Sequence, residues 1–238
     1  MDIEIKVAIM QPYIFPYIGY FQLINSVDKF IFYDDVNFIK GGWINRNRIL
    51  SNGKENLFTV PLDDASSFKQ INATGLNPRL YAKWKLKFFR TISQSYSKAL
   101  YYQDVYPLLE KTFDSVTTIS ELSINSVKLV CDYLCIDTKF YLSSSDFPGS
   151  KGMEREDRLV HVCRKSDSKH YINMIAGSTL YTKDSFLKNG IVLNFLKPII
   201  TEYPQKNKDF VEGLSIIDVL MFNSKQEVKE MLNKFILI

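Results

Sequence analysis

Residues 5–36 read IKVAIMQPYIFPYIGYFQLINSVDKFIFYDDV, and this stretch decides the predicted fold. Its first apolar run, residues 5–10, predicts a buried strand that stops at a Gln-Pro pair. Residues 17–27 carry apolar side chains at helical spacing and predict a helix. Residues 29–36 predict a second strand, which ends in two acids. A strand, a helix and a strand joined by short turns are typical of parallel neighbours in an α/β sheet.

The rest of the chain extends this pattern around a central helical block. Further strands are predicted at residues 55–62, 68–76 (at an edge), 138–146, 170–177 and 191–198, and further helices at 79–96, 104–116, 118–136, 157–167, 179–190, 214–223 and 225–235. The fold expected is an α/β fold with a doubly wound, mostly parallel Rossmann-like sheet, interrupted by a helical insertion at about 78–136. No Pro/Gly/Ser-rich linker divides the chain, so we treat residues 1–238 as a single α/β unit.

The composition describes an ordinary globular protein. The 238 residues are 46% hydrophobic and 24% charged, with a formal net charge of +4. This charge is too small for a dedicated nucleic-acid binder, and it is compatible with an anionic small substrate or the headgroup side of a membrane. We expect no transmembrane segment, no secretory signal and a cytoplasmic location. A homo-oligomer is possible.

The cysteines lack the spacing of a metal site. Cys131 and Cys135 stand four residues apart in a helical pattern and are expected to share an apolar face as reduced thiols, and Cys163 stands alone. With only two histidines in the chain, a metal site is not predicted. His161 lies within a helical pattern and is expected to be packed or at the surface.

Polar residues follow the predicted strands, where ligands bind in open α/β sheets. The densest segment is 34–48, DDVNFIKGGWINRNR. Its two arginines could grip a phosphate or carboxylate, its tryptophan could stack on a base or sugar, and its acids could act as a base or bind hydroxyls. The alternative is a solvated loop with Arg–Asp pairs. The predicted catalytic acids are Asp34 and Asp35, and the predicted binding residues are Lys40, Trp43, Asn45, Arg46, Asn47 and Arg48.

The loop after the first strand offers a second group of candidates. In adenylyl- and cytidylyltransferases, a His-x-Gly-His motif at this place lets the base approach a helix start and neutralises phosphate charge. Here phenols replace the histidines, and a phenol has a pKa near 10 and carries no positive charge. Tyr17 is predicted to be catalytic, and the predicted binding residues are Gln11, Tyr13, Gly19 and Tyr20.

The later strand ends add four predicted binding residues: Ser144, Arg158, Asn173 and Tyr181. Arg155 and Arg158 open a helix and could close over an anion, although helix-start charges are equally ordinary. Asp218 stands between apolar residues and is expected to cap a helix or to pair with a buried arginine.

Several long motifs resemble the WbqC-like family of bacterial proteins, which are encoded among surface-polysaccharide (O-antigen) biosynthesis genes. The matching stretches are IMQPYIFPYIGYFQLI, DKFIFYDDVNFIKGGWINRNRI, LFTVPL, DRLVHVC, YINMIAGSTLY and LSIIDVLMFN, and they extend from residue 7 to about 223. The resemblance implies a role in modifying or assembling an unusual sugar of lipopolysaccharide or a similar glycan. It carries no agreed catalytic residues.

Three hypotheses follow for the function. The leading one is a transferase that moves an acyl or aminoacyl group onto a nucleotide-linked amino sugar, with the nucleotide-linked sugar or the acyl donor as its partner. The second is a nucleotidyltransferase-like activating enzyme. The third is a non-catalytic scaffold that binds another protein of the glycan pathway. The sequence predicts no tightly bound cofactor and no nucleic-acid partner.

Overall fold

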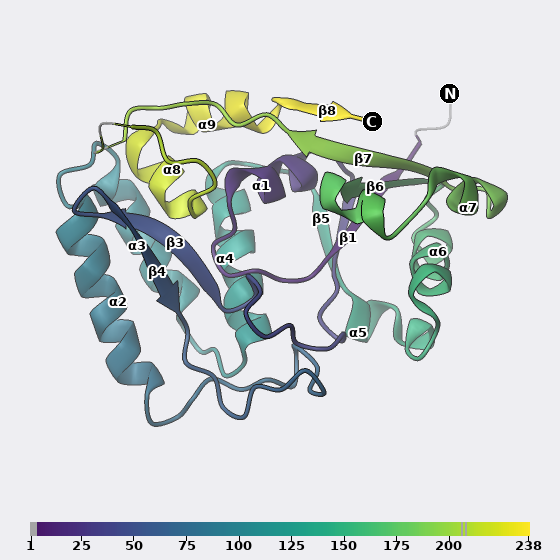
Figure 1. Cartoon of the computed structure of the whole chain (residues 1–238), viewed down its shortest axis with the longest axis horizontal. Helices are drawn as coiled ribbons and strands as arrows, with labels where there is room; N and C mark the ends of the chain where they lie inside the picture. Colours follow the sequence, from purple (N-terminus) through teal and green to yellow (C-terminus); the bar gives the residue numbers. More distant parts are fainter. Residues whose placement is uncertain (1–3, 206, 208) are drawn as a thin grey trace.

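The computed structural model describes residues 4–205, 207 and 209–238, and a six-stranded sheet forms its centre (Figure 1). The strand order is β5-β2-β1-β6-β7-β8. All neighbours pair in parallel except β7 and β8, which are antiparallel. The strands are β1 (Lys6–Met10), β2 (Lys29–Phe32), β5 (Lys139–Leu142), β6 (His170–Met174), β7 (Val192–Pro198) and β8 (Phe235–Leu237). The predicted α/β fold with a mostly parallel sheet is confirmed.

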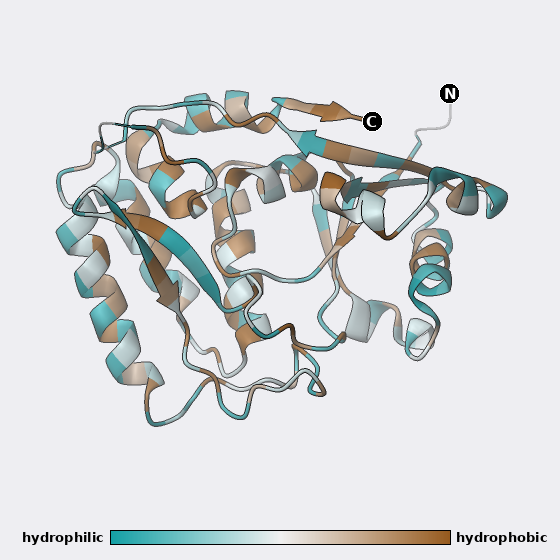
Figure 2. Ribbon diagram, in the orientation of Figure 1, coloured by the Kyte–Doolittle hydropathy of each residue, from teal (hydrophilic) through white to brown (hydrophobic). Residues whose placement is uncertain are grey.

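The sheet separates two apolar cores, because successive strand residues point to opposite faces. Ala8, Phe30 and Ile172 belong to the larger core. Val7, Ile31 and Tyr171 belong to the smaller one on the other face. The brown segments of the strands and of the helices around them mark this apolar composition (Figure 2). The chain winds from β1 to β2 in one direction and from β6 to β7 in the other, so the strand order reverses between β1 and β6.

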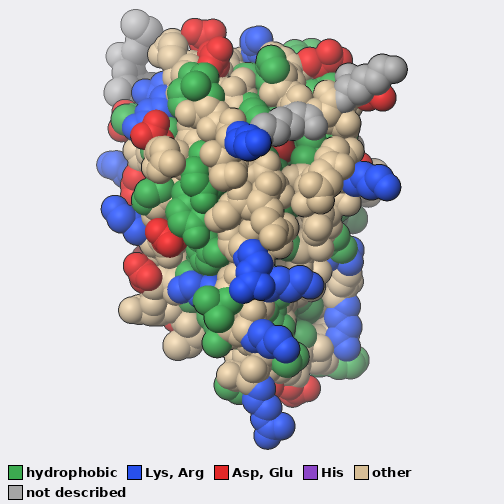
Figure 3. All heavy atoms as spheres, turned by 90° about the vertical axis from the view of Figure 1, so that its left-hand side faces the viewer, with side chains coloured by type: hydrophobic (Ala, Val, Ile, Leu, Met, Phe, Trp, Pro, Cys, Tyr) green, Lys and Arg blue, Asp and Glu red, His purple; other side chains and the backbone are tan. Residues whose placement is uncertain are grey.

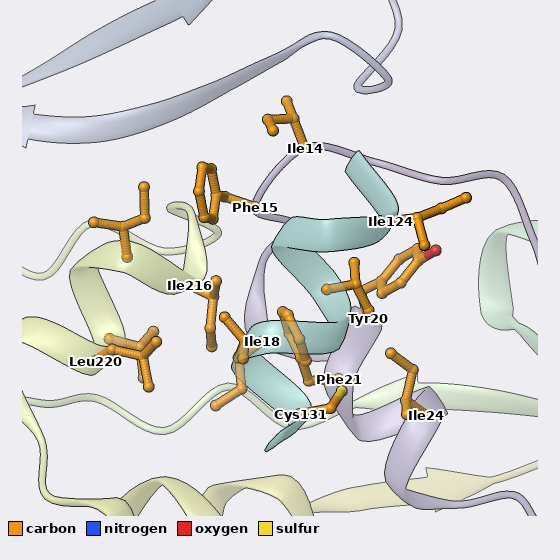
Figure 4. Packing of buried hydrophobic residues seen from close by; sticks show 14 of the residues in the cluster. Ile14, Phe15, Ile18, Tyr20, Phe21, Ile24, Ile124, Cys131, Ile216 and Leu220 are labelled. Atoms are coloured by element: carbon orange, nitrogen blue, oxygen red, sulfur yellow. The ribbon is translucent and has the colours of Figure 1, made fainter. Parts of the chain in front are cut away.

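Helices from both ends of the chain and from its middle pack on the larger core. They are α1 (Ile18–Asn25), α2 (Tyr81–Tyr96), α3 (Tyr102–Thr112), α4 (Ile119–Tyr133), α8 (Ile216–Phe222) and α9 (Lys225–Leu232). Figure 4 shows apolar side chains of α1, α4 and α8 in one packed cluster. Helices α6 (Arg155–Lys165) and α7 (Lys183–Lys188) pack on the smaller core.

A separate two-stranded hairpin replaces part of the predicted polar loop. Strands β3 (Arg46–Ser51) and β4 (Lys54–Thr59) pair antiparallel across a turn at Asn52 and Gly53, both of which have positive φ angles. The sequence pattern had missed β3, because its polar and apolar residues alternate within a segment dominated by charge. The predicted edge strand 68–76 is wrong, since that segment forms only isolated bridges.

Residues 81–133 contain α2, α3 and α4, with a capping box at the start of α4. Helix α4 ends at Tyr133, and Cys135 has a φ of 52°, which takes it out of the helical phase. Cys131 is therefore buried and Cys135 exposed, and the expected shared apolar face is wrong. No helix in the described part of the chain is long and apolar enough to cross a membrane.

The predicted strand 138–146 stops earlier than expected. Strand β5 ends at Leu142, whose backbone N–H donates to the Asp146 carboxylate over 2.6 Å. The short helix α5 (Ser143–Asp146) and the 3-10 turn η1 (Pro148–Ser150) follow. This early turn brings Ser143 and Ser144 to the end of β2, where they meet its two acids.

Candidate functional site

A cavity of about 800 Å³ lies at the carboxyl ends of β1, β2 and β6. This is where the strand order reverses, the place at which open α/β sheets bind ligands. Gln11 follows β1, Asp35 follows β2 and Asn173 stands at the end of β6. The sequence therefore predicted the position of the cavity from the polar residues that follow the strands.

A buried ion pair forms one wall of this cavity. Arg158 Nη2 donates to both carboxylate oxygens of Asp35, over 2.7 and 2.6 Å, and Arg158 Nε donates to Ser150 Oγ over 3.1 Å. The guanidinium also lies over the Tyr33 ring, 4.6 Å from its centroid. Arg158 also makes a side-chain hydrogen bond with Tyr33, so the guanidinium and the phenol together form a polar wall of the cavity.

The two neighbouring acids differ in how fully they are used. A carboxylate accepts about four hydrogen bonds. Asp34 has four possible donors, from Ser143 Oγ, Ser144 N, Ser144 Oγ and Asn72 Nδ2. Among the described residues, Asp35 has three, two from Arg158 and one from Ser143, whose single proton is shared between both acids. Asp35 alone lines the cavity and keeps an acceptor position open.

Asn173 is held in place by a close backbone approach. Its Oδ1 accepts from the Met174 N–H over 2.8 Å, and this fixes the direction of its amide group. Gly177, in the 3-10 turn η2 (Ile175–Thr179), lies so close that a Cβ there would be 2.5 Å from Asn173 Nδ2. The Asn173 amide N–H groups have no partner within the described residues and border the cavity.

Two phenols line the same cavity as neutral donors. Burial raises the pKa of Tyr33, while the Arg158 guanidinium partly opposes this effect. Burial also raises the pKa of Tyr181, and Arg155 lowers it. Both side chains therefore keep their protons at neutral pH, and both can donate a hydrogen bond to an oxygen-rich ligand.

A second, smaller cavity of about 220 Å³ lies on the other side of Tyr13. Its walls include Tyr17, Trp43 and Arg48, and Tyr13 lines both cavities. Trp43 is 42% exposed, so its ring is accessible to a flat ligand. The Arg46 and Arg48 guanidinium carbons each lie 5.6 Å from the Trp43 ring centroid.

The two predicted anion-binding arginines differ in their contacts. Arg48 Nη1 pairs with Glu55 over 2.6 Å, and Nη2 donates to the Gly213 carbonyl over 3.3 Å. Its Nε is buried without a partner in the described chain. Arg46 donates to the carbonyls of Gly42 and Gly41 and does not line either cavity.

Gly19 makes room for a protein side chain. A Cβ on Gly19 would overlap the Tyr17 ring, so this ring lies against the start of α1. Burial, followed by the nearby Tyr13 and Glu212, raises the pKa of Tyr17 to about 12. Tyr17 is therefore a neutral donor at the edge of the smaller cavity.

Several predicted site residues support the loops and do not line the larger cavity. Asn47 Nδ2 donates to the carbonyls of Ile14 and Phe15 over 3.2 and 2.7 Å, although this residue also borders the smaller cavity. Phe15 has a φ of 40°, and these bonds help to hold that conformation. Tyr20 donates to the Gln11 carbonyl over 2.8 Å and Asn45 to that of Val60 over 2.9 Å. Lys40 and Ser144 border neither cavity, and Lys40 is exposed.

Among the uncharged polar side chains that line the larger cavity, those of Tyr33, Asn37 and Tyr171 had not been predicted. Tyr33 directly follows β2, so the rule that ligands bind beyond strand ends could have identified it.

Asp218 also differs from the expectation. It accepts from Tyr96 and Tyr203 over 2.7 and 2.8 Å, so the expected pairing with a buried arginine is wrong.

In the described ranges, no three or more His, Cys, Asp and Glu side chains are grouped to hold a metal ion. A model of the WbqC-like protein family matches residues 11–230, which include every residue of the smaller cavity and all of the larger one except Ile9 and Met10. This chain belongs to the WbqC-like protein family.

This WbqC-like protein is also similar to a curated protein of Mycobacterium tuberculosis (strain ATCC 25618 / H37Rv), which bears the name "Uncharacterized protein Rv1507c". The two are 29% identical over 231 residues, covering 95% of this chain and 97% of the relative. No solved structure matches this WbqC-like protein at a significant level. The similarity to the relative therefore extends over almost the whole of both chains.

Proposed function

We propose that this protein is a transferase of surface-polysaccharide biosynthesis that moves an acyl or aminoacyl group onto a nucleotide-linked amino sugar. The observation that carries the proposal is the pair of cavities on either side of Tyr13. One cavity is rich in hydrogen-bond donors, and the other presents an accessible indole. The resemblance of this chain to a family encoded among O-antigen biosynthesis genes supports a role in making a surface polysaccharide.

The sugar fits the larger cavity at the strand ends. Arg158, the Asn173 amide and the phenols of Tyr33 and Tyr181 supply polar groups to hydroxyl and phosphate oxygens. Arg155 is exposed at the same cavity and adds a second cation. Because few acceptors balance these donors, the cavity favours a ligand that is rich in oxygen atoms and negatively charged.

The nucleoside fits the smaller cavity. Trp43 offers its face for stacking, and Arg48, which lines the same cavity, supplies a positive charge for a phosphate group. Tyr17 donates a neutral hydrogen bond at the same place. Tyr13 then lies beside the diphosphate that joins the two halves of the ligand.

The chemical step needs an acceptor for one proton. The amine of the sugar attacks the carbonyl carbon of an activated acyl donor, a C–N bond forms, and the bond from that carbon to the leaving group breaks. Asp35 has an unused acceptor position at the cavity, and in this proposal it takes the amine proton. Asp35 then passes this proton to the leaving group. Asp34, whose acceptor positions are occupied, orients Ser143 and Ser144.

The experiments must also distinguish the transferase from two alternative functions, a nucleotidyltransferase-like enzyme and a non-catalytic scaffold. A nucleotidyltransferase-like activity would need positive charge at the phosphates beside α1, and the neutral Tyr17 phenol does not supply it. A scaffold that binds a partner protein would not need the buried donors of the larger cavity. Pyrophosphate release with ATP or CTP identifies the first alternative, and a stable protein partner without small-molecule binding identifies the second.

Fluorescence of Trp43 provides the experiment. The chain contains two tryptophans, and Trp84→Phe removes the one that stacks on Phe88, leaving Trp43 as the reporter. Titration with UDP-, GDP- and dTDP-linked amino sugars is expected to change its emission and to raise the melting temperature.

Variants separate binding from general charge effects. Arg155→Ala is expected to weaken binding about tenfold or more, since it removes one charge-assisted contact. Arg164→Ala, on the same helix and away from both cavities, removes an equal charge and serves as the matched control. The proposal is rejected if no nucleotide sugar changes the emission or the melting temperature and both variants behave like the parent.

A further inference from the structure

The outer face of α2 combines positive charge with exposed leucines. Lys83, Lys87 and Arg90 are exposed along it, and Leu86 between them is 71% exposed. Arg79 and Leu80 stand just before the helix, where Leu80 is 56% exposed. We call these six residues the basic face: Arg79, Leu80, Lys83, Leu86, Lys87 and Arg90.

The charge of the basic face is not neutralised by its own segment. From Asp64 to Asp104 the intervening sequence contains no acidic residue but seven Lys and Arg residues. Since the whole chain has a net charge of +4, the remaining residues are net acidic, and the positive charge is concentrated in this segment. Of the ion pairs formed by described residues, none involves a residue of the basic face.

Helical geometry brings these side chains together. Lys83, Leu86, Lys87 and Arg90 are three or four residues apart, so they share one side of α2 and span about 10 Å along its axis. The opposite side buries Phe88, Ile92 and Tyr96 in the core and fixes the helix in this orientation. Figure 3 views this end of the molecule and shows Lys and Arg side chains through its middle and lower part, with hydrophobic side chains beside them.

We propose that the basic face is a docking surface for an anionic lipid bilayer. Lys and Arg side chains near a membrane are attracted to acidic headgroups, and leucines of an amphipathic helix enter the boundary between headgroups and acyl chains. Nucleic-acid phosphates would satisfy the charges but leave Leu80 and Leu86 in water. The combination of cations and leucines on one rigid helix therefore favours a bilayer. This inference does not depend on the proposed function.

Vesicle co-sedimentation of the full chain tests the proposal. We expect binding to vesicles of phosphatidylglycerol and phosphatidylcholine, little binding to phosphatidylcholine alone, and weaker binding as salt rises. The triple variant Lys83→Glu, Lys87→Glu and Arg90→Glu should bind at least tenfold more weakly. Leu86→Ser should weaken binding without changing its dependence on salt.

A second triple variant controls for net charge. Lys165, Lys169 and Lys188 are exposed. Lys165 is at the end of α6, Lys169 lies between α6 and β6, and Lys188 is at the end of α7. Lys165→Glu, Lys169→Glu and Lys188→Glu make the same change in charge and should leave vesicle binding within about twofold. Circular dichroism confirms that each variant is folded. Equal loss in the two triple variants, no effect of Leu86→Ser, or preference for RNA over acidic vesicles in competition would each overturn the proposal.

Discussion

Asp35 and Arg158 form a buried ion pair that joins the end of β2 to the first turn of α6. The side chains are 4% and 7% exposed, so both charges are largely removed from water. Ser150 and Ser143 each add one hydrogen bond to the pair. The pair therefore fixes one wall of the larger cavity, and it lies between two elements that pack on the smaller core.

Removing one partner of this pair should be costly. Arg158→Met leaves the Asp35 carboxylate buried without its cation, and we expect the free energy of unfolding to fall by about 3–5 kcal/mol. Urea unfolding measures the change. The double variant Asp35→Leu, Arg158→Met removes both charges and should recover most of the loss. A double variant that is no more stable than Arg158→Met alone would contradict this account.

Gly177→Ala should impair binding through its neighbour Asn173. The added Cβ would lie 2.5 Å from Asn173 Nδ2 and must displace the amide from the larger cavity. We expect at least tenfold weaker binding of a nucleotide-linked amino sugar in the Trp43 titration, with a fall in stability of about 1–3 kcal/mol.

A matched background isolates this effect. In an Asn173→Ala variant the obstructing amide is absent, so Gly177→Ala should cause almost no further loss of binding or stability. If the two substitutions act additively, the Gly177 effect does not pass through Asn173.

Asp218 should make stability depend on pH. Burial raises its pKa above the usual 3.8, and among the described residues its hydrogen-bond partners are neutral. The protonated form is therefore favoured in the folded state, and the resulting stabilisation is fully present below pH 3.8. It is lost as pH rises through the folded-state pKa, at a slope of at most about 1.4 kcal/mol per pH unit.

The measurement compares the parent with Asp218→Asn by urea unfolding across this pH range. The stability of the parent relative to the variant should fall as pH rises from 3.8 and then level off. A relative stability that rises with pH would show that the Tyr96 and Tyr203 hydroxyls stabilise the carboxylate more than burial destabilises it.

Gln22→Leu should loosen the C-terminal elements. The Gln22 amide nitrogen lies 2.8, 2.9 and 3.2 Å from the carbonyls of Met231, Lys234 and Ile199, and the side chain is fully buried. Leaving these carbonyls without a donor should cost about 1–3 kcal/mol. Hydrogen exchange should accelerate in α9 and β8 and remain unchanged in α6. Equal acceleration in α6 would indicate global destabilisation.

The sheet was predictable from the sequence because its strands are short apolar runs between helical patterns. Strand β1 and helix α1 were predicted close to their observed positions, and so were α2, α4 and β7. The hairpin strand β3 was missed because Arg46 and Arg48 alternate with Asn47 and Ile49, and charge hides the alternation. The edge strand 68–76 failed because Gln70, Gly75 and Leu76 each form an isolated bridge to a different segment, and no continuous ladder forms.

The position of the cavity was also predictable, whereas the exposure of each residue within it was not. Gln11, Asp35 and Asn173 follow strands, and this rule placed them correctly at the cavity. Asp34 and Asp35 are adjacent and alike in sequence, but only the fold shows that serines and Asn72 surround Asp34. Arg46 likewise turns to the nearby carbonyls of Gly41 and Gly42, which no spacing rule reveals.

The bonds of Gln22 also bear on the order in which the chain is made. Helix α1 is synthesised well before residues 199, 231 and 234, whose carbonyls accept hydrogen bonds from its buried Gln22 side chain. During synthesis, the Gln22 amide must remain without these partners, or be shielded by a chaperone, until α9 and Lys234 have emerged. Slow translation of the intervening two hundred or so residues would lengthen this vulnerable interval, so codon usage in the gene should affect the yield of folded protein.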